Sequence, residues 1–134
     1  MSELVRDAML SDPLALEADR SAREAGEALA RPDVRVVFVV SERRLVGAVT
    51  RKTLVREIVA AGRDPETTLL GEFAERPNHT IACEMPLDQA FAELEELDLE
   101  RVPVVDGDRL VGVLSRSVVQ RRLAEDEPPP DSED

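Results

Sequence analysis

The sequence predicts a mixed α/β fold, an α+β arrangement with a mixed sheet, in which one β-α-β-β-α unit occurs twice. Residues 45–51 read Leu-Val-Gly-Ala-Val-Thr-Arg, and residues 110–116 read Leu-Val-Gly-Val-Leu-Ser-Arg. The same offset of 65 residues, from position 45 to position 110, also aligns Leu29 with Leu94. A repeat at one constant spacing indicates two copies of a single structural unit. In both copies, apolar runs of strand length alternate with helical periodicity.

Chain length indicates how the two copies fold. With 134 residues the chain can bury one core, whereas a half of about 60 residues would leave too much of its surface in water. We therefore expect two repeats, residues 1–62 and 66–123, to pack on each other about a pseudo-two-fold axis. Residues 125–134 carry six acidic side chains, three prolines and no base. This composition predicts a disordered acidic tail, either a solvated appendage or a contact for a partner.

The first repeat opens with short elements. Residues 4–9 predict a short helix and residues 14–16 a short strand. Ser21 and Glu24 have the spacing of a capping box, in which the serine oxygen accepts from a backbone amide and the glutamate accepts from the amide of the serine. A helix should begin there and end before Pro32.

A hairpin and a second helix complete the first repeat. Residues 36–40 form an apolar run too short for anything but a buried strand. Residues 45–49 should be the returning strand. Thr50 is placed to cap a helix that runs to Ala61 and ends at Gly62, since glycine tolerates a left-handed helix terminus.

The second repeat shows the same order of elements. Asp106-Gly107 is a strong hairpin turn between strands at residues 102–105 and 110–114. Ser115 should cap a last helix that fades after Leu123. The helix before the hairpin has a clear apolar stripe, made of Leu87, Ala90, Phe91, Leu94 and Leu97.

Composition excludes several classes of function. The net charge of -12 disfavours binding to nucleic acid or to an anionic membrane surface. No apolar run approaches the roughly 20 residues of a membrane span, and the amino terminus lacks the pattern of a signal peptide. We therefore expect a cytoplasmic protein. Cys83 is the only cysteine, which predicts a buried, unreactive thiol. The preference for arginine over lysine and the abundant alanine suggest a bacterial source.

These motifs resemble those of the CBS domain. The resemblance rests on the order of elements, the Pro-Val-Val-Asp-Gly turn at residues 103–107 and the Leu-Val-Gly-x-x-Ser/Thr-Arg step in both repeats. Two copies in tandem resemble a CBS pair, or Bateman module, of the stand-alone bacterial type. The resemblance implies adenine nucleotides or S-adenosylmethionine bound in clefts between the repeats, a disc-shaped homodimer, and regulation of an attached or partner protein.

Phosphate oxygens could bind where each hairpin leads into its helix. A helix start presents unpaired amides and a partial positive charge, and a hydroxyl with a neighbouring base adds to both. Thr50, Arg51 and Lys52 fit this description in the first repeat, and Ser115 and Arg116 fit it in the second. The alternative is that both hydroxyls only cap their helices and that the arginines are solvated.

The sequence departs from the family at the ribose position. The family places an aspartate three residues after the hydroxyl, where its two oxygens accept from both ribose hydroxyls. Here these positions hold Thr53 and Val118. Thr53 could still make one hydrogen bond, worth about 1 kcal/mol, whereas Val118 offers none. The first repeat is therefore expected to be the better nucleotide site.

The adenine side is also altered. Pro103 matches a proline of the family's middle strand, but its counterpart in the first repeat is Phe38. The phenyl ring could stack on a base or could fill the pocket, and we favour filling because so few aromatic residues are available to the core. Thr80 and Ile81 match a short strand whose backbone contacts the ligand in the family.

The sequence offers no recognisable catalytic arrangement. His79 is the sole histidine and has no second ligand at metal-binding spacing. No nucleophile is paired with a base, so we expect no enzyme activity and no required cofactor.

Two functional hypotheses follow. The first is a regulatory module that senses AMP, ATP or another adenosyl ligand and signals to an unknown partner protein. The alternative is a ligand-free module for dimerisation or protein docking, whose clefts are filled by side chains. Both predict a homodimer, formed through the small and aliphatic faces of the helices that start at Ala22 and Leu87.

Overall fold

The computed structural model describes residues 3–126 and divides the chain into two compact units. Within the described residues, unit 1 comprises residues 3–11, 79–107 and 111–126, and unit 2 comprises residues 12–78 and 108–110. The compact units and the sequence repeats are thus different divisions of the chain. The amino-terminal segment belongs to the unit that holds most of the second repeat.

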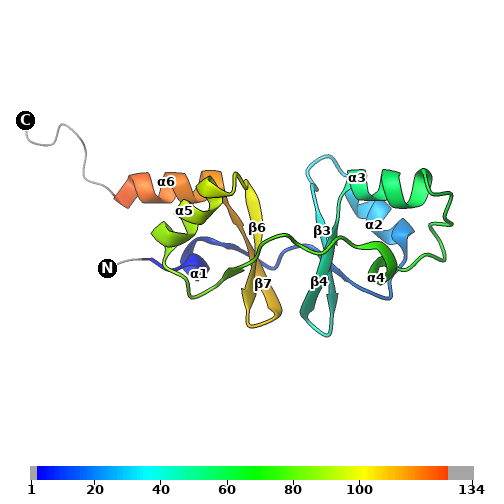
Figure 1. Ribbon diagram of the computed structural model, residues 1–134, viewed down its shortest axis with the longest axis horizontal. Helices are drawn as coiled ribbons and strands as arrows, with labels where there is room; N and C mark the ends of the chain where they lie inside the picture. The colour runs from blue at the N-terminus through cyan, green and yellow to red at the C-terminus, as the bar shows by residue number, and fades with distance from the viewer. Residues whose placement is uncertain (1–2, 127–134) are drawn as a thin grey trace, which may run out of the picture. The chain divides into compact units, whose positions relative to one another are not determined.

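Unit 2 contains a three-stranded mixed sheet with helices packed on it (Figure 1). Strand β2 runs parallel to β3, and β3 pairs antiparallel with β4. This is the pattern that a helical crossover followed by a hairpin requires. The elements of unit 2 are β2 (Ala15–Glu17), α2 (Ala22–Leu29), β3 (Val37–Ser41), β4 (Arg44–Val49), α3 (Arg51–Leu54), the π-helix η1 (Val55–Val59) and α4 (Leu70–Phe73).

Unit 1 repeats this arrangement. Strand β5 runs parallel to β6, β6 lies beside β7, and β1 pairs antiparallel with β7. Helices α5 and α6 pack against each other. The elements are α1 (Val5–Ala8), β1 (Leu10–Ser11), β5 (Ile81–Ala82), α5 (Leu87–Glu96), β6 (Arg101–Asp106), β7 (Arg109–Ser115, whose first two residues cluster with unit 2) and α6 (Arg116–Asp126). Two β-α-β-β-α repeats are therefore present, as the sequence predicts.

Matching backbone hydrogen bonds tie a segment into each unit. In unit 1 the amide of Val5 donates to the carbonyl of Met85 at 2.9 Å. In unit 2 the amide of Leu70 donates to the carbonyl of Arg20 at 2.9 Å. Positions 5 and 70, and positions 20 and 85, differ by the same repeat offset. Each unit is therefore completed by the segment that leads into the other repeat.

Local signals in the sequence are reproduced in the structure. Ser21 Oγ accepts from the amide of Glu24 at 3.2 Å, and the amide of Ser21 donates to the Glu24 carboxylate at 3.3 Å, which is the expected capping box. Gly62 and Gly107 have positive φ angles of 72° and 67°. Glycine favours this left-handed region because it has no Cβ. The hairpin turn therefore lies where it is predicted, and Gly62 has the predicted left-handed conformation, although the helical segment before it ends at Val59 rather than at Ala61.

The helix predicted to run from Thr50 to Ala61 is not regular. It is α-helical only to Leu54, and Val55–Val59 is a π-helix, with the amide of Ala60 donating to the carbonyl of Val55 at 2.8 Å. The β-branched side chains in this stretch weaken the α-helical preference. At the other end of the chain, α6 extends past Leu123 to Asp126. The predicted tail thus begins within α6, and residues 127–134 lie outside the described residues.

Each unit has a mainly aliphatic core, as expected for a chain without Trp or Tyr, and Phe73 is the aromatic member of the core cluster of unit 2. Leu97, predicted to belong to the apolar stripe, lies just after α5 and is 48% exposed. In the described part of the chain, no helix is long and apolar enough to cross a membrane. The core of unit 2 contains Ala22, Ala25, Leu29, Val37, Val39, Val49, Ile58, Leu70 and Phe73. The core of unit 1 contains Val5, Ala8, Ile81, Cys83, Leu87, Ala90, Leu94, Val102, Val104, Leu114 and Val119.

Candidate functional site

The first candidate site is the start of α3 in unit 2, where Thr50 and Thr53 cap each other. Thr50 Oγ1 accepts from the amide of Thr53 at 3.3 Å, and the amide of Thr50 donates to Thr53 Oγ1 at 3.1 Å. The two hydroxyl oxygens lie 3.0 Å apart. Thr53 is fully buried. Thr50 therefore caps the helix as predicted, and much of the hydrogen-bonding capacity of both side chains is used within the protein.

A carboxylate that sequence reasoning missed also contacts this helix start. Glu75 Oε1 accepts a hydrogen bond from Thr53 Oγ1 at 3.2 Å, and Glu75 Oε2 pairs with Arg56. The backbone of Glu75 exchanges two hydrogen bonds with that of Ala48 in β4, at 2.8 and 2.9 Å. Gly47 makes this crossing possible, because a Cβ at this position would lie 2.7 Å from the Glu75 carbonyl oxygen.

The cations of the first repeat differ in their surroundings. Arg51 donates to the backbone carbonyl of Arg31 at 2.8 Å, so it is directed toward the end of α2. Lys52 is exposed and has no side-chain partner among the described residues. The Arg56 guanidinium donates hydrogen bonds to Glu57 and to Glu75. These bonds, the one to Glu57 most of all, raise the pKa of Arg56 above its usual value. The start of α3 thus has one cation whose side chain has no partner among the described residues, Lys52, and one carboxylate, Glu75, that is already paired with Arg56.

The start of α6 in unit 1 is the second candidate site. Ser115 Oγ donates to Glu100 Oε2 at 3.3 Å and shares a hydrogen bond of 3.0 Å with Ser117 Oγ. Arg116 forms ion pairs with Asp98 at 3.3 Å and with Glu100 at 3.7 Å. Arg116 is therefore neutralised by its neighbours. The Glu100 carboxylate thus contacts both Ser115 and Arg116 at this helix start.

Besides an open, largely polar cavity of about 650 Å³ beside the β3–β4 hairpin of unit 2, the described residues form two smaller cavities, and the larger of these two lies at the start of α6. The volume of the cavity at the start of α6, about 430 Å³, is in the range of small-molecule sites. One of the lining residues, Arg101, is exposed, and its side chain has no hydrogen bond or ion pair among the described residues. The wall is otherwise mainly apolar. The cavity is lined by Ala8, Met9, Leu10, Arg101, Val113, Ser115, Ser117 and Val118.

Gly112 shapes this cavity as Gly47 shapes the other helix start. A Cβ on Gly112 would lie 2.9 Å from the carbonyl oxygen of Leu10, so the glycine allows residues 9 and 10 to cross β7 closely. Strand β1 pairs here with β7, with Leu10 opposite Val113. Leu10 is 68% exposed and forms part of the cavity wall.

The other predicted ligand contacts do not line this cavity. Ile81 is fully buried in β5, paired with Val104, and Pro103 is buried in β6. Thr80 is exposed just before β5. In unit 2, Phe38 is 5% exposed and is paired across the sheet with Ala15 and Ala48. A phenyl ring that fills the adenine pocket of the first repeat has to be buried, and the Phe38 ring is buried.

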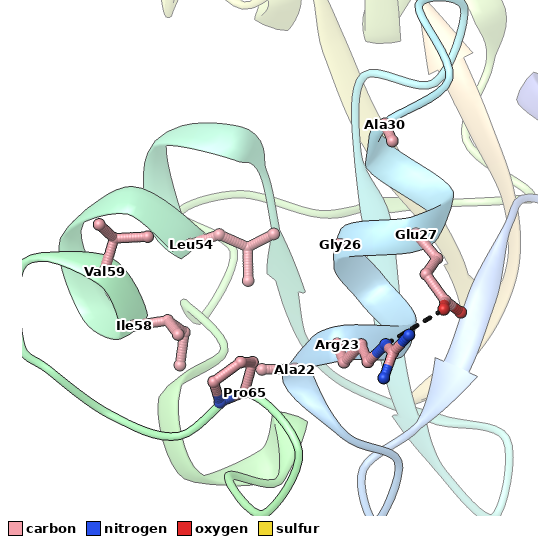
Figure 2. A pocket seen from close by; sticks show the side chains of 9 residues that line it. All are labelled: Ala22, Arg23, Gly26, Glu27, Ala30, Leu54, Ile58, Val59 and Pro65. Atoms are coloured by element: carbon pink, nitrogen blue, oxygen red, sulfur yellow. Dashed lines mark ion pairs between the residues drawn. The ribbon is translucent and has the colours of Figure 1, made fainter.

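The smaller cavity is an apolar pocket of unit 2 between α2 and the α3–η1 segment (Figure 2). An ion pair of 3.3 Å between Arg23 and Glu27 lies at its edge. Val59 is 72% exposed and Val55, on the same π-helix, is 58% exposed. The pocket is lined by Ala22, Arg23, Gly26, Glu27, Ala30, Leu54, Ile58, Val59 and Pro65.

The sole histidine is part of a local contact. His79 Nε2 lies 2.9 Å from Glu93 Oε1, and both side chains are about one third exposed. Among the residues that the structure describes, no group of three or more His, Cys, Asp or Glu side chains is arranged to hold a metal ion.

Comparisons with known proteins identify the repeats. The CBS domain family matches residues 5–60 and 70–125. Hypoxic response protein 1 of Mycobacterium tuberculosis is 33% identical over 82 residues, which are 61% of this chain but only 57% of that relative. A crystal structure of Hypoxic Response Protein I with two coordinated zinc ions superposes with a TM-score of 0.76 at 25% identity, covering 90% of this chain and 98% of that one.

A second solved structure has the same fold. It is a protein from Vibrio cholerae, described as an acetoin utilization protein (AcuB), and it superposes with a TM-score of 0.75 at 22% identity. The superposition covers 96% of this chain and all of that one. With both repeats matched by one family and the whole arrangement shared with solved structures, the chain belongs to the CBS domain family as a CBS pair.

Proposed function

We propose that this chain is a regulatory CBS-pair module that binds an adenine nucleotide or a related adenosyl ligand and signals to a separate partner protein. CBS pairs are commonly regulatory and ligand-binding, and stand-alone members are generally not catalytic. The observation that carries the proposal is the cavity at the start of α6, where two serine hydroxyls and an unpaired arginine meet an apolar wall. No metal or cofactor is required in this proposal.

The lining side chains suggest how a ligand would bind. The Arg101 guanidinium would form charge-assisted hydrogen bonds with phosphate oxygens. Ser115 and Ser117 would donate or accept at neighbouring oxygens. Met9 and Leu10 would pack against the base, since polarisable and aliphatic side chains cover an aromatic face well. Each role uses a group that the described residues leave accessible.

We assign the ligand to the second repeat, although the sequence favours the first. That preference rests on the hydroxyl of Thr53, which in the structure is buried and bonded to Glu75. In the second repeat, Val118 offers no acceptor to a ribose hydroxyl. An unpaired buried hydroxyl costs about 1–3 kcal/mol, so binding should be weak. Thr80 and Ile81, through their backbone groups, and Pro103, on the adenine side, stay predictions.

Self-association is the second part of the proposal. We propose that the chain forms a homodimer through the apolar pocket of unit 2, because Val55 and Val59 expose apolar surface beside it. A fold neighbour, a hexameric CBS-CP12 protein from bloom-forming cyanobacteria, supports assembly into oligomers, with a TM-score of 0.65 at 19% identity. If no ligand binds, this surface favours the alternative of a docking module. The acidic surface also supports a cytoplasmic role without nucleic acid or membrane.

Thermal unfolding with millimolar AMP, ATP or S-adenosylmethionine tests the proposal. A ligand at about 100 times its dissociation constant adds about 2.7 kcal/mol to the free energy of unfolding. We expect the native chain to show such a rise and R101A to lose it. Arg121, an exposed arginine of α6 outside the cavity, supplies the matched control R121A. If none of the three compounds shifts the transition, the ligand-free docking module is the better description.

A further inference from the structure

The arm of unit 1, residues 3–11, forms one wall of the cavity at the start of α6. Ala8, Met9 and Leu10 are three of the eight residues that line this cavity. The arm consists of α1 and β1, and it ends at Ser11, where the chain passes from unit 1 to unit 2. If the arm leaves its place in unit 1, the cavity therefore loses this wall.

The repeat supplies a matching arm in unit 2, residues 68–76. In unit 1 the amides of Val5 and Arg6 lie 2.9 and 3.0 Å from carbonyl oxygens of the segment before α5, to which they donate. In unit 2 the amides of Leu70 and Gly71 donate in the same way to carbonyl oxygens of the segment before α2, both at 2.9 Å. These backbone hydrogen bonds correspond one to one, so they do not distinguish the two arms.

The side chains do distinguish the arms, because the arm of unit 1 buries smaller ones. Val5 is fully buried and Ala8 is 8% exposed. At the equivalent positions of the other arm, Leu70 is fully buried and Phe73 is 7% exposed. The free energy gained by burial grows with the apolar area that is removed from water. The arm of unit 1 is therefore held less strongly.

The first residue of each arm differs in the same direction. Glu3 pairs with Arg122 of α6 at 2.7 Å, but its other carboxylate oxygen, Oε1, is buried without a hydrogen-bond partner among the described residues. The equivalent residue, Thr68, donates its hydroxyl to the carbonyl of Asp64 at 2.7 Å. A buried oxygen without a partner opposes docking of the arm. Few buried apolar contacts and an incompletely bonded polar group are typical of segments that open locally.

We infer that the arm of unit 1 opens and closes independently of the rest of the unit, and that a ligand in the cavity holds it closed. A ligand that contacts Met9 and Leu10 favours the closed arm, so its binding free energy adds to the stability of that state. Occupancy of the cavity is then reported by the position of residues 3–11. This coupling rests on the proposed function for its ligand, whereas independent opening of the arm does not.

Hydrogen exchange of the native full-length chain, followed by NMR, tests the inference. Without ligand, the amides of Val5 and Arg6 should exchange at least about tenfold faster than those of Leu70 and Gly71, because their arm opens more readily. Equal rates would show that the two arms are held alike, and the inference would be wrong. ATP at about ten times its dissociation constant should slow the exchange of Val5 and Arg6 about tenfold. The R101A chain should not show this slowing.

Two valine substitutions test whether the arm opens by itself. V5A removes two methyl groups from the arm without changing the cavity lining, so it should speed exchange of the Arg6 amide at least about tenfold. V104A is the matched control, because Val104 is a fully buried valine of the same core but belongs to β6. It should speed exchange of the Leu94 amide in α5 and leave that of Arg6 unchanged. If V104A speeds both amides equally, the arm opens only with the whole unit and the inference is refuted.

The inference and the proposed function fail in different ways. If calorimetry detects ATP binding but the exchange of Val5 and Arg6 does not slow, the ligand site stands and the coupling to the arm is wrong. If no compound binds while Arg6 exchanges independently of Leu94, the proposed function fails and the independent opening of the arm stands.

Discussion

Gly47 lies directly under the backbone of Glu75: a Cβ at position 47 would come within 2.7 Å of the Glu75 carbonyl oxygen and 3.0 Å of the Ala74 side chain. Both neighbours are held in place, Glu75 by its paired hydrogen bonds to Ala48. The conserved geometry of this crossing in both units makes the glycine of the repeated motif a packing requirement. The Leu-Val-Gly pattern in the sequence thus has a physical explanation.

We predict that G47A destabilises the protein. The added methyl group has to push the crossing segment away from β4, and overpacking of this kind costs about 1–3 kcal/mol. The free energy of unfolding can be measured by urea titration followed by circular dichroism. G26A in α2 is the matched control, because its new Cβ would meet only Leu54 at 3.8 Å and should stabilise the helix by about 0.5–1 kcal/mol. Equal stability of G47A and the native chain would contradict the prediction.

We predict that T53V lowers stability even though its shape is preserved. The substitution removes a buried hydroxyl that bonds to Glu75 and to the amide of Thr50. Each lost hydrogen bond is worth about 0.5–1.5 kcal/mol. T67V, at an exposed position of the same unit, should change the urea midpoint little. A T53V chain as stable as the native chain would show that these bonds contribute nothing net.

We predict that V59E abolishes self-association. Val59 is 72% exposed at the edge of the apolar pocket, and a buried carboxylate without a partner is strongly unfavourable. Sedimentation velocity at micromolar concentration should show a dimer for the native chain and a monomer for V59E. L14E is the control, because Leu14 is also exposed but does not line the pocket. A monomeric native chain would refute the proposed dimer.

We predict that metal removal leaves stability unchanged. Hypoxic Response Protein I was crystallised with two coordinated zinc ions, but the described residues here contain no cluster of metal-ligand side chains. His79 is instead paired with Glu93 at 2.9 Å. EDTA should not alter the thermal transition, and zinc at equimolar concentration should not raise it. A zinc-dependent rise that H79Q removes would contradict this expectation.

Short-range signals made much of the fold predictable. Ser21 and Glu24 are three residues apart, so their reciprocal hydrogen bonds follow from the sequence alone. The positive φ angle of Gly107 likewise follows from an Asp-Gly turn between two apolar runs. The order of strands and helices in both repeats follows from such local patterns, and the structure confirms it.

The candidate site was less predictable, because its decisive contacts join distant positions. Thr53 and Glu75 are separated by 22 residues, and no periodicity links them. The only available signal was the repeat, which pairs Glu75 with Leu10 and so marks a difference between the two copies. Arg101 was not predicted either, because it is the charged first residue of the strand β6 and belongs to no motif. The π-helix was not predicted either, because the β-branched Val55, Ile58 and Val59 weaken the α-helical preference without by themselves indicating a π-helix.

The exchange of segments between the two sequence repeats has a consequence for how such a chain could arise. The arm around Val5 completes the unit built on residues 79–107, and the arm around Leu70 completes the unit built on residues 12–62. In a polypeptide with only one repeat, the amino-terminal segment would have no second repeat to pack against. Two copies of that polypeptide could exchange arms, and fusing them end to end would join both exchanges in a single chain. The covalent tandem is then a dimer made permanent.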